Sequence, residues 1–391
     1  MMTALLVMGA AIALFWWGLV ARLLAKVAAF RPLAPEPWPT DRPSPSIAVI
    51  VPAHNEEAEV EATVSDILAQ DQPALMLTVV DDQSTDATGA ILDRLADAEP
   101  RLHAIHGESR PAGWVGKTWA LHQGVRGTSS DWILFIDADM RLHPSAVSTA
   151  LLEAERTGAD MVSFLPKGEC RTFWQTATAL TLGQVLGQLY PLDAVNDPKR
   201  PEALAAGGFI LIRRAAYERL GGHEAVRSEI VDDILLARRL KAAGGRLICR
   251  SAPDLASTHL YGSVRDIYRG LRKNAYAGME YQPHKYVFGV IVAALTAWVP
   301  WICLVAGVFA GDLAVSTAGV AGVLGQVAVS YPLTVFLGVS PLAGLSLPLG
   351  ISLYIAIATA SVRDYYSGRI IWKGRAMAVD TIFATPPSDA P

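Results

Sequence analysis

The chain of 391 residues has little cysteine and little charge. Its three cysteines, Cys170, Cys249 and Cys303, have neither the spacing of a metal site nor that of a disulfide framework, so we expect them to be reduced. Charged residues make up 18% of the chain and the net charge is -4. This charge gives no general affinity for polyanions, and we expect no nucleic-acid partner.

Two phosphate-binding motifs are also missing. No GxGxxG follows the first predicted strand, which argues against a dinucleotide-dependent oxidoreductase. The loop GWVGKTWAL, at residues 113–121, does not have the GxxxxGK[ST] spacing of a P-loop. Lys117 lies near the start of the following helix, where it can neutralise a phosphate or serve as an ordinary loop lysine.

Hydrophobic residues make up 52% of the chain, which is too apolar for a soluble enzyme and suggests membrane segments beside a soluble part. Residues 1–30 are apolar enough to cross a bilayer and include Trp16 and Trp17. Basic residues follow this stretch instead of preceding it, which is unlike a secretory signal. We therefore predict a membrane helix that leaves the next domain in the cytoplasm, at the inner membrane.

The region 286–361 is also membrane-like and predicts a multi-pass protein. It contains two good spans and one weaker one, at residues 286–310, 342–360 and 313–338. Three spans would place the tail, residues 362–391, outside the cell. The basic residues of this tail instead indicate the cytoplasm, so we expect one of the stretches to be a re-entrant segment or a hairpin.

Between these regions lies a predicted α/β domain at residues 47–285, after a proline-rich linker at 31–46 that cannot form regular structure. Short apolar runs alternate with stretches of helical spacing, which indicates a mostly parallel sheet with crossover helices. The predicted strands are 47–54, 76–82, 102–107, 132–136, 161–164 and 209–212. The predicted helices are 57–70, 86–98, 117–126 and 230–243.

The run WILFIDADM, at residues 132–140, reads as a buried strand whose carboxyl end carries Asp137, Ala138 and Asp139. Ligands of open α/β sheets bind at this end of the strands. Two carboxylates there suit a hard divalent cation, which in turn suits a diphosphate. A solvated acidic turn is the alternative.

Two more strand ends face the same predicted crevice. The first is VPAHNEE, with Pro52, Ala53, Asn55 and Glu56, and the second is VVDDQSTD. In the second, Asp81 or Asp82 can accept a hydrogen bond from a nucleobase or a ribose, or simply end a strand. Residues 84–86 are better explained as a helix cap.

Several later groups are candidates for binding or catalysis. Gly207 and Gly208 precede a strand and allow a substrate or a backbone to approach closely. Asp232 and Asp233 begin an amphipathic helix, where acids favour the helix dipole or one acts as a general base toward an acceptor hydroxyl. His259 is a possible metal or phosphate partner, or a satisfied loop histidine.

Two helices lie near the predicted membrane region. Arg269 and Arg272 share one helix face and can meet a diphosphate or anionic lipid headgroups. Residues 171–192 form a helix that is too polar for an ordinary span. We expect it to lie at the membrane surface, to line an acceptor groove, or to be a core helix.

Taken in order, the motifs VPAHNEE, VVDDQSTD, DAD, GGF, VDD and RGLR resemble those of the GT-A glycosyltransferases of family 2. The resemblance covers about residues 47–281. Within the family, the arrangement of motifs is similar to that of the ceramide-glucosyltransferase-like enzymes, including the hopene-associated glycosyltransferases. It implies a GT-A, Rossmann-like catalytic domain flanked by transmembrane helices.

The resemblance also implies a role for each matching residue. Asp81 and Asp82 would hold the nucleotide, and Asp137 and Asp139 would bind Mg²⁺ or Mn²⁺, with Asp139 as the direct ligand. Asp233 matches the catalytic base, although Asp232 stands where the family usually has Glu and is the alternative base. The pair Arg269 and Arg272 matches the motif (Q/R)xxRW, but Lys273 replaces its Trp.

From these features we expect an inverting transferase that moves a sugar from a nucleotide sugar, with UDP as the favoured nucleotide, to a membrane lipid hydroxyl. A hopanoid or another polycyclic or isoprenoid lipid is the favoured acceptor. The alternatives are a polyprenyl-phosphate sugar synthase and a non-catalytic membrane scaffold. A processive polysaccharide synthase is disfavoured because the Trp is missing.

Overall fold

A computed structural model describes residues 1–25, 31–72, 74–260, 262–368, 370–372 and 375–377. The chain divides into two compact units. An α/β unit contains residues 30–167 and 190–259, and a helical unit contains the N-terminal helix, residues 168–189 and the region 260–376. The predicted domain at 47–285 is thus divided between the two units. The end of the first predicted span, residues 26–30, and the final residues of the tail, 378–391, lie outside the described residues.

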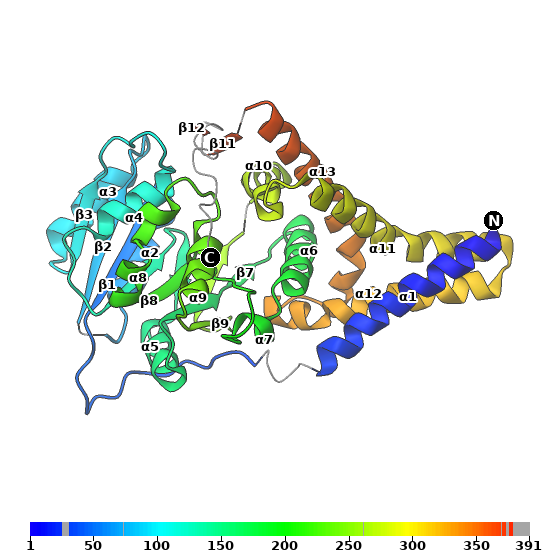
Figure 1. Cartoon of the computed structure of the whole chain (residues 1–391), viewed down its shortest axis with the longest axis horizontal. Helices are drawn as coiled ribbons and strands as arrows, with labels where there is room; N and C mark the ends of the chain where they lie inside the picture. The colour runs from blue at the N-terminus through cyan, green and yellow to red at the C-terminus, as the bar shows by residue number, and fades with distance from the viewer. Residues whose placement is uncertain (26–30, 73, 261, 369, 373–374, 378–391) are drawn as a thin grey trace. The chain divides into compact units, whose positions relative to one another are not determined.

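The α/β unit is built on a seven-stranded sheet with the order β3-β2-β1-β4-β8-β6-β9 (Figure 1). Its strands are β1 (Ile47–Ala53), β2 (Leu75–Asp81), β3 (Leu102–His106), β4 (Trp132–Ile136), β6 (Met161–Leu165), β8 (Phe209–Arg213) and β9 (Leu247–Ser251). All neighbours are parallel except β8, which is antiparallel to both β4 and β6. The predicted, mostly parallel α/β fold is confirmed.

Helices cover both faces of this sheet, so its strands are buried on both sides. Alternate residues of β1 enter different cores: Val49 and Val51 enter one, and Ala48 and Ile50 the other. The helices are α2 (Val60–Leu68), α3 (Thr88–Ala98), α4 (Gly116–Val125), α5 (Ala146–Thr157), α7 (Leu192–Val195), α8 (Arg214–Arg219), the 3₁₀ helix η2 (Gly222–Val226) and α9 (Asp232–Ala242). Two short strands, β5 (Met140–Leu142) and β10 (Ala256–His259), pair antiparallel.

The proline-rich linker has no helix or strand, as predicted, yet it is packed against the α/β unit. The Glu36 N–H donates to Thr149 Oγ1 of α5 at 2.9 Å. Trp38 is buried, and the Arg42 guanidinium lies over its ring at 4.0 Å. The prolines prevent regular structure but do not prevent a fixed path.

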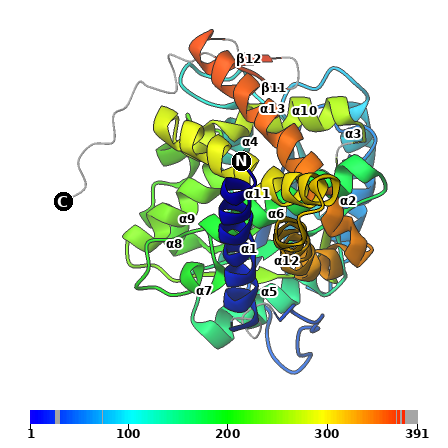
Figure 2. The same cartoon turned by 90° about the vertical axis from the view of Figure 1, so that its right-hand side faces the viewer.

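In the helical unit, α1, α11 and α12 lie side by side (Figures 1 and 2). Its elements are α1 (Met2–Ala25), β7 (Lys167–Glu169, at the boundary of the units), α6 (Phe173–Leu189), α10 (Val264–Ala275), the 3₁₀ helix η3 (Ala277–Met279), α11 (Pro283–Ala310), α12 (Leu313–Leu337), the 3₁₀ helix η4 (Pro341–Ser346), α13 (Leu347–Tyr366), β11 (Ile370–Trp372) and β12 (Arg375–Met377). Among the residues that the structure describes, four helical segments are long and apolar enough to cross a membrane: α1, α11, α12, and η4 with α13.

Helix α12 corresponds to the predicted weaker span. Its polar side chains find hydrogen-bond partners on α11 or on their own helix. The Gln326 amide donates to the carbonyls of Thr296 and Ala297 on α11, both at 2.9 Å. Ser330 and Thr334 donate to carbonyls of their own helix. Polar groups satisfied in this way are tolerated in an apolar environment.

Helix α6 packs within the helical unit instead of lying in the α/β core. Its Gln184 amide donates to the Val329 carbonyl of α12 at 2.9 Å. Gly350 of α13 lies against the backbone of Ala177 and the hydroxyl of Thr181. The glutamines that made this helix too polar for a span are therefore partly used in contacts with apolar helices.

Candidate active site

The loops that follow β1 and β2 are tied together at the carboxyl edge of the sheet. Asn55 has a positive φ of 52°. Its N–H donates to Ser84 Oγ at 2.9 Å, and its side-chain oxygen accepts from the Thr85 N–H at 2.8 Å. The Asp86 carboxylate accepts from the N–H and hydroxyl of Thr88 at the start of α3. Residues 84–86 therefore join the two loops and cap the start of α3, in agreement with their interpretation as a helix cap.

The predicted nucleotide-binding pair lies at the end of β2, which pairs with the end of β1 at Ala53 and Asp81. Asp81 is buried, and its carboxylate accepts from the Ser84 N–H at 2.9 Å. His106 Nδ1 of β3 is 3.6 Å from the other oxygen of Asp81. Asp82 is also buried, and its carbonyl oxygen lies 2.7 Å from Nδ1 of His54.

A lysine and three acids that are far apart in the sequence meet in the α/β unit. Lys117 of α4 lies with its Nζ 2.6 Å from Oδ1 of Asp137, just after β4. The two aspartates at the start of α9 complete the group, and all four side chains line one small cavity. We call Lys117, Asp137, Asp232 and Asp233 the acid–lysine cluster. Lys117 is thus more than an ordinary loop lysine.

The charges of the cluster depend on one another. Burial disfavours a charged Lys117, but Asp137, Asp232 and Asp233 outweigh it and raise the pKa of the lysine above its ordinary value. Burial raises the pKa of Asp232 to about 6, against the opposing effect of Lys117. Burial likewise raises the pKa of Asp233. The lysine therefore stays charged and is the counter-ion of the three acids.

The two aspartates of α9 differ in exposure and in their hydrogen bonds. Asp232 is only 7% exposed, whereas Asp233 is partly exposed. The Asp233 oxygens accept from the N–H groups of Gly207, at 2.9 Å, and Ile234, at 2.8 Å. These backbone donors fix the orientation of the Asp233 carboxylate.

The two predicted glycines before β8 serve different contacts. A Cβ on Gly207 would lie 3.1 Å from both Asp233 Oδ2 and Lys117 Nζ, so the missing side chain keeps the acid–lysine cluster compact. A Cβ on Gly208 would lie 2.8 Å from the sulfur of Met140. Gly208 therefore allows the close packing of β5, and its contact with an acceptor or sugar stays a prediction.

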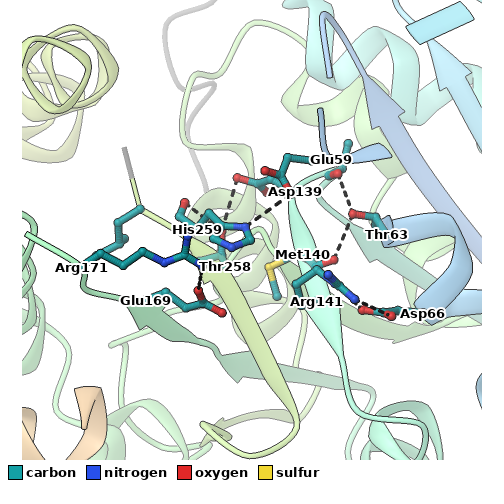
Figure 3. Close-up of polar contacts among 12 residues, drawn as sticks. Glu59, Thr63, Asp66, Asp139, Met140, Arg141, Glu169, Arg171, Thr258 and His259 are labelled. Carbon is teal, nitrogen blue, oxygen red and sulfur yellow. Dashed lines mark hydrogen bonds and ion pairs between the residues drawn. The ribbon is translucent and has the colours of Figure 1, made fainter. Parts of the chain in front are cut away.

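Asp139 lies two residues beyond Asp137 and, like it, is half-buried. Its Oδ2 accepts from the Thr258 hydroxyl at 3.3 Å (Figure 3). Burial raises its pKa to about 6, and the carboxylates of Asp137 and Glu56 add to the effect. Ala138, between the two acids, is buried and fixed through its carbonyl, which accepts from Thr63 Oγ1 at 2.7 Å.

The two carboxylates at 137 and 139 suit Mg²⁺ or Mn²⁺ bound together with a diphosphate, because Mg²⁺ commonly takes one or two carboxylates plus substrate phosphates. Among the described residues, no group of three or more His, Cys, Asp or Glu side chains is arranged to hold a metal. His259 Nδ1 instead lies 3.4 Å from the Glu59 carboxylate (Figure 3). A metal role for His259 stays a prediction.

The two arginines of the RGLR motif lie on α10 in the helical unit and have different surroundings. Arg272 is ion-paired with Asp364 of α13, and its guanidinium lies 5.6 Å from the Tyr268 ring centroid. Arg269 is exposed. Contact of either arginine with a diphosphate stays a prediction.

Two buried residues beside the cluster were not expected from the sequence. Tyr217 and His223 are 5% and 2% exposed, and His223 lines the same cavity as the acids. The pair Gly221 and Gly222, both with positive φ, marks this turn and is the one sequence signal that could have identified it.

Comparison with known proteins shows which family part of the α/β unit is similar to. Residues 48–221 match the model of Glycosyl transferase family 2. This match covers the strand ends at Asp81 and Asp137, whereas the aspartates of α9 lie beyond it.

Curated relatives of this region include two bacterial proteins named 4,4'-diaponeurosporenoate glycosyltransferase. The Staphylococcus aureus protein is 27% identical over 202 residues, which cover 49% of this chain and 50% of the relative. The Staphylococcus haemolyticus protein is 25% identical over 196 residues, 49% of this chain and 51% of the relative. The chain therefore spans about half the length of the curated relatives it matches.

Among solved structures, the mannosyltransferase PcManGT from Pyrobaculum calidifontis, in complex with GDP-Man and Mn²⁺, resembles the chain over most of its length. The TM-score is 0.53 at 19% sequence identity, over 91% of this chain and 99% of that one. With the family 2 match, this likeness confirms the GT-A fold.

Proposed function

We propose that the protein is a membrane-bound, inverting glycosyltransferase that transfers a sugar from a nucleotide sugar to a lipid hydroxyl at the cytoplasmic face of the inner membrane. The observation that carries the proposal is the acid–lysine cluster, of which Lys117 and Asp137 lie in the region similar to family 2. A cluster of this kind combines acids for a metal and a base with a fixed cation for a diphosphate.

Three features support a lipid acceptor. The described part of the chain contains four candidate membrane spans, and the curated relatives are named 4,4'-diaponeurosporenoate glycosyltransferase. In the helical unit, a cavity of about 430 Å³ is lined mainly by apolar side chains, among them Phe173 of α6, Leu342 and Leu345 of η4, and Leu349 of α13. A cavity of this kind suits a hydrocarbon group. The hopanoid class, suggested by the resemblance of the motifs, is the acceptor to test first.

For the donor, we assign the metal to Asp137 and Asp139 and the nucleotide to Asp81 and Asp82. The Mn²⁺ and GDP-Man of the solved relative support a divalent ion with a nucleotide sugar. When bound, the ion would stabilise the negative charge on the leaving diphosphate. Lys117 would add a positive charge beside Asp137, one of the two proposed metal ligands.

In the proposed reaction the acceptor oxygen forms a bond to the anomeric carbon, and the bond from that carbon to the diphosphate breaks. The diphosphate leaves with the bonding electron pair, and the acceptor proton moves to the Asp233 carboxylate. Asp233 suits this role better than Asp232 because it is partly exposed and is oriented by two backbone donors. Burial raises the pKa of Asp233, which makes its carboxylate a stronger base than an exposed aspartate.

Nucleotide release tests the proposal. The full chain, purified in detergent, is supplied with UDP-, GDP- and dTDP-sugars in turn, with Mn²⁺ or with a chelator, and with or without a bacterial lipid extract. We expect release from one donor that requires both Mn²⁺ and the extract. We also expect Asp139→Ala to abolish it, whereas Asp97→Ala, at an exposed position of α3, leaves it intact.

The acceptor class is resolved in the same assay by separating the extract on an anion-exchange resin. Activity with the neutral fraction supports a lipid hydroxyl. Activity confined to the phosphate-bearing fraction would replace it with a polyprenyl phosphate. No release and no Mn²⁺-dependent nucleotide binding with any donor would favour the non-catalytic alternative.

A further inference from the structure

A buried chain of polar groups leads from Tyr217 through His223 to Asp232. The Tyr217 hydroxyl lies 2.8 Å from His223 Nδ1, and it accepts from the His223 backbone N–H at 3.0 Å. On the other side of the ring, His223 Nε2 lies 3.8 Å from Asp232 Oδ2. All three side chains are more than nine-tenths buried.

This geometry determines which ring nitrogen of His223 carries the proton. The pKa of His223 is lowered to about 3 by burial, with smaller contributions from Lys117 and His122, so the ring is neutral. The Tyr217 hydroxyl already accepts the backbone N–H, and its own proton is directed to Nδ1, the ring acceptor beside it. The remaining proton therefore lies on Nε2, where it points at the Asp232 carboxylate.

The sequence LGGH, residues 220–223, builds this arrangement locally. Gly221 and Gly222 have φ values of 77° and 57°, which favour glycine. A Cβ on Gly222 would lie 2.8 Å from the Tyr217 ring. The Phe135 ring holds the other side of the imidazole, edge to face at a centroid distance of 4.7 Å. The turn and strand β4 thus fix the ring of His223.

We propose that His223 is a positioning residue that donates from Nε2 to the Asp232 carboxylate, so that Asp232 stays beside Lys117 and Asp233 is left to act as the base. The inference rests on the proposed glycosyl transfer. The separation of 3.8 Å is long for a hydrogen bond, and the contact closes when the donor binds, because catalytic hydrogen bonds often tighten only in the substrate complex.

The consequence is a division of roles between two adjacent acids. Asp233 is oriented by two backbone donors, so its orientation does not depend on His223. Asp232 has a neutral donor on one side and the charge of Lys117 on the other. Without His223 the Asp232 carboxylate turns fully toward Lys117 and draws it from Asp137.

Nitrogen NMR of ¹⁵N-histidine-labelled protein tests the geometry without substrate. We expect one neutral histidine with its proton on Nε2, unchanged between about pH 7 and pH 5 because its pKa lies far below this range. Its signal should disappear in His223→Gln and persist in His103→Gln, which changes an exposed residue of β3. A His223 protonated on Nδ1, or charged at pH 5, would overturn the proposal.

Kinetics with Mn²⁺ and the donor identified by nucleotide release test the role. Gln places its amide near the position of Nε2, whereas Asn reaches only the position of Nδ1. We expect His223→Gln to retain kcat within about threefold and His223→Asn to lose about 10- to 100-fold, as expected when a reacting group is misplaced. The KM for the nucleotide sugar should change little in either variant.

Tyr217→Phe completes the series, because it leaves Nδ1 without its donor and weakens the preference for Nε2–H. We expect a loss of kcat between those of the Gln and Asn variants and a second histidine tautomer in the NMR spectrum. Equal losses in His223→Gln and His223→Asn would show a purely structural role and overturn the proposal. A wild-type protein inactive with every donor would refute the proposed function instead, while the NMR result would still stand.

Discussion

Lys117 places one positive charge among three carboxylates, and this balance explains why the acids can lie so close together. Its Nζ is 2.6 Å from Asp137, and Asp232 and Asp233 help to raise its pKa. Like charges in a shared buried site are costly unless a cation compensates them. The lysine therefore performs, in the absence of metal, part of the neutralisation that a divalent ion would provide.

Removing this charge should weaken both stability and activity. In Lys117→Met we expect a lower thermal midpoint in chelator, because three carboxylates lose their counter-ion, and a larger increase on adding Mn²⁺ than in the wild type. We also expect kcat to fall about 100-fold or more, the usual effect of removing a charge-stabilising group. Thermal unfolding in detergent and nucleotide release measure these effects.

Arg126→Met is the matched control for this substitution, since it removes a positive charge from the exposed end of the same helix. It should leave both properties near the wild-type values. An equal Mn²⁺ effect in Lys117→Met and the wild type would contradict the assigned role of Lys117.

Metal binding should depend on pH through Asp139. Burial raises its pKa to about 6, so the carboxyl is largely neutral below this pH and must lose its proton before it can bind a cation. We expect the apparent Mn²⁺ affinity to rise about tenfold from pH 5 to pH 7 and to level off above. Calorimetric titration measures it, and Asp139→Asn should bind weakly with little pH dependence. Equal wild-type affinity at both pH values would refute the assignment.

At the scale of residues, the sequence predicts the groups that follow strands better than those that depend on tertiary contacts. Asp81 and Asp137 are predictable because a strand of known direction places its carboxyl end at the ligand edge. The ion-pair partner of Asp137 is not predictable, because Lys117 lies on helix α4, which precedes the strand that ends just before Asp137. His223 is hidden for the same reason, since the turn that carries it meets Asp232 only in the folded domain.

At the scale of elements, the predicted strands and helices fall within a few residues of the observed ones, but several elements, among them α5 and β9, were not predicted. Helix α5 is buried on nearly all sides as far as Ala154, so it has no polar face to reveal its period. Strand β9 contains Arg250, which pairs with the buried Glu153 of α5. A helix that is buried on all sides lacks the amphipathic period of a surface helix. A strand that contains a charged residue lacks the apolar run of a buried strand.

The close packing of α6 against α13 makes a testable prediction about two glycines. A Cβ on Gly350 would collide with the Ala177 carbonyl, whereas a Cβ on Gly289 of α11 would meet nothing within 4 Å. Gly350→Ala should therefore destabilise the protein by about 1–3 kcal/mol through overpacking. Gly289→Ala should be neutral or stabilise it by about 0.5–1 kcal/mol, because alanine favours the helix. Thermal unfolding of both variants in detergent checks the difference, and equal midpoints would contradict the packing.

At the scale of the whole molecule, contacts within the helical unit show how its long helices run. Trp16 Nε1 of α1 donates to the Thr296 carbonyl of α11 at 3.0 Å, and Cys303 Sγ of α11 donates to the Leu5 carbonyl at 3.4 Å. Helices α1 and α11 are therefore antiparallel. Helix α12 returns beside α11 after the short turn at residues 311–312.

Helix α13 follows a different path from the other candidate spans. At its start, Leu347 packs with Trp16 and Val329, which lie well inside α1 and α12 and not at their ends. Toward its end, Thr359 lies 2.8 Å from the hydroxyl of Tyr286, near the beginning of α11. The chain therefore enters among the helices after α12 and leaves on the side where α11 begins. This path favours the re-entrant alternative for the predicted span at 342–360.

A re-entrant segment removes the conflict between the number of spans and the basic tail. With three crossings, by α1, α11 and α12, the end of α13 lies on the same side as the start of α11, which is the predicted cytoplasmic side. The ion pair of Arg272 on α10 with Asp364 on α13 agrees, because α10 directly precedes α11. We therefore expect a green fluorescent protein fused after Pro391 to be fluorescent and an alkaline phosphatase fused there to be inactive. Both reporters inserted at Gly311 should give the opposite result, and active phosphatase at Pro391 would instead require four complete crossings.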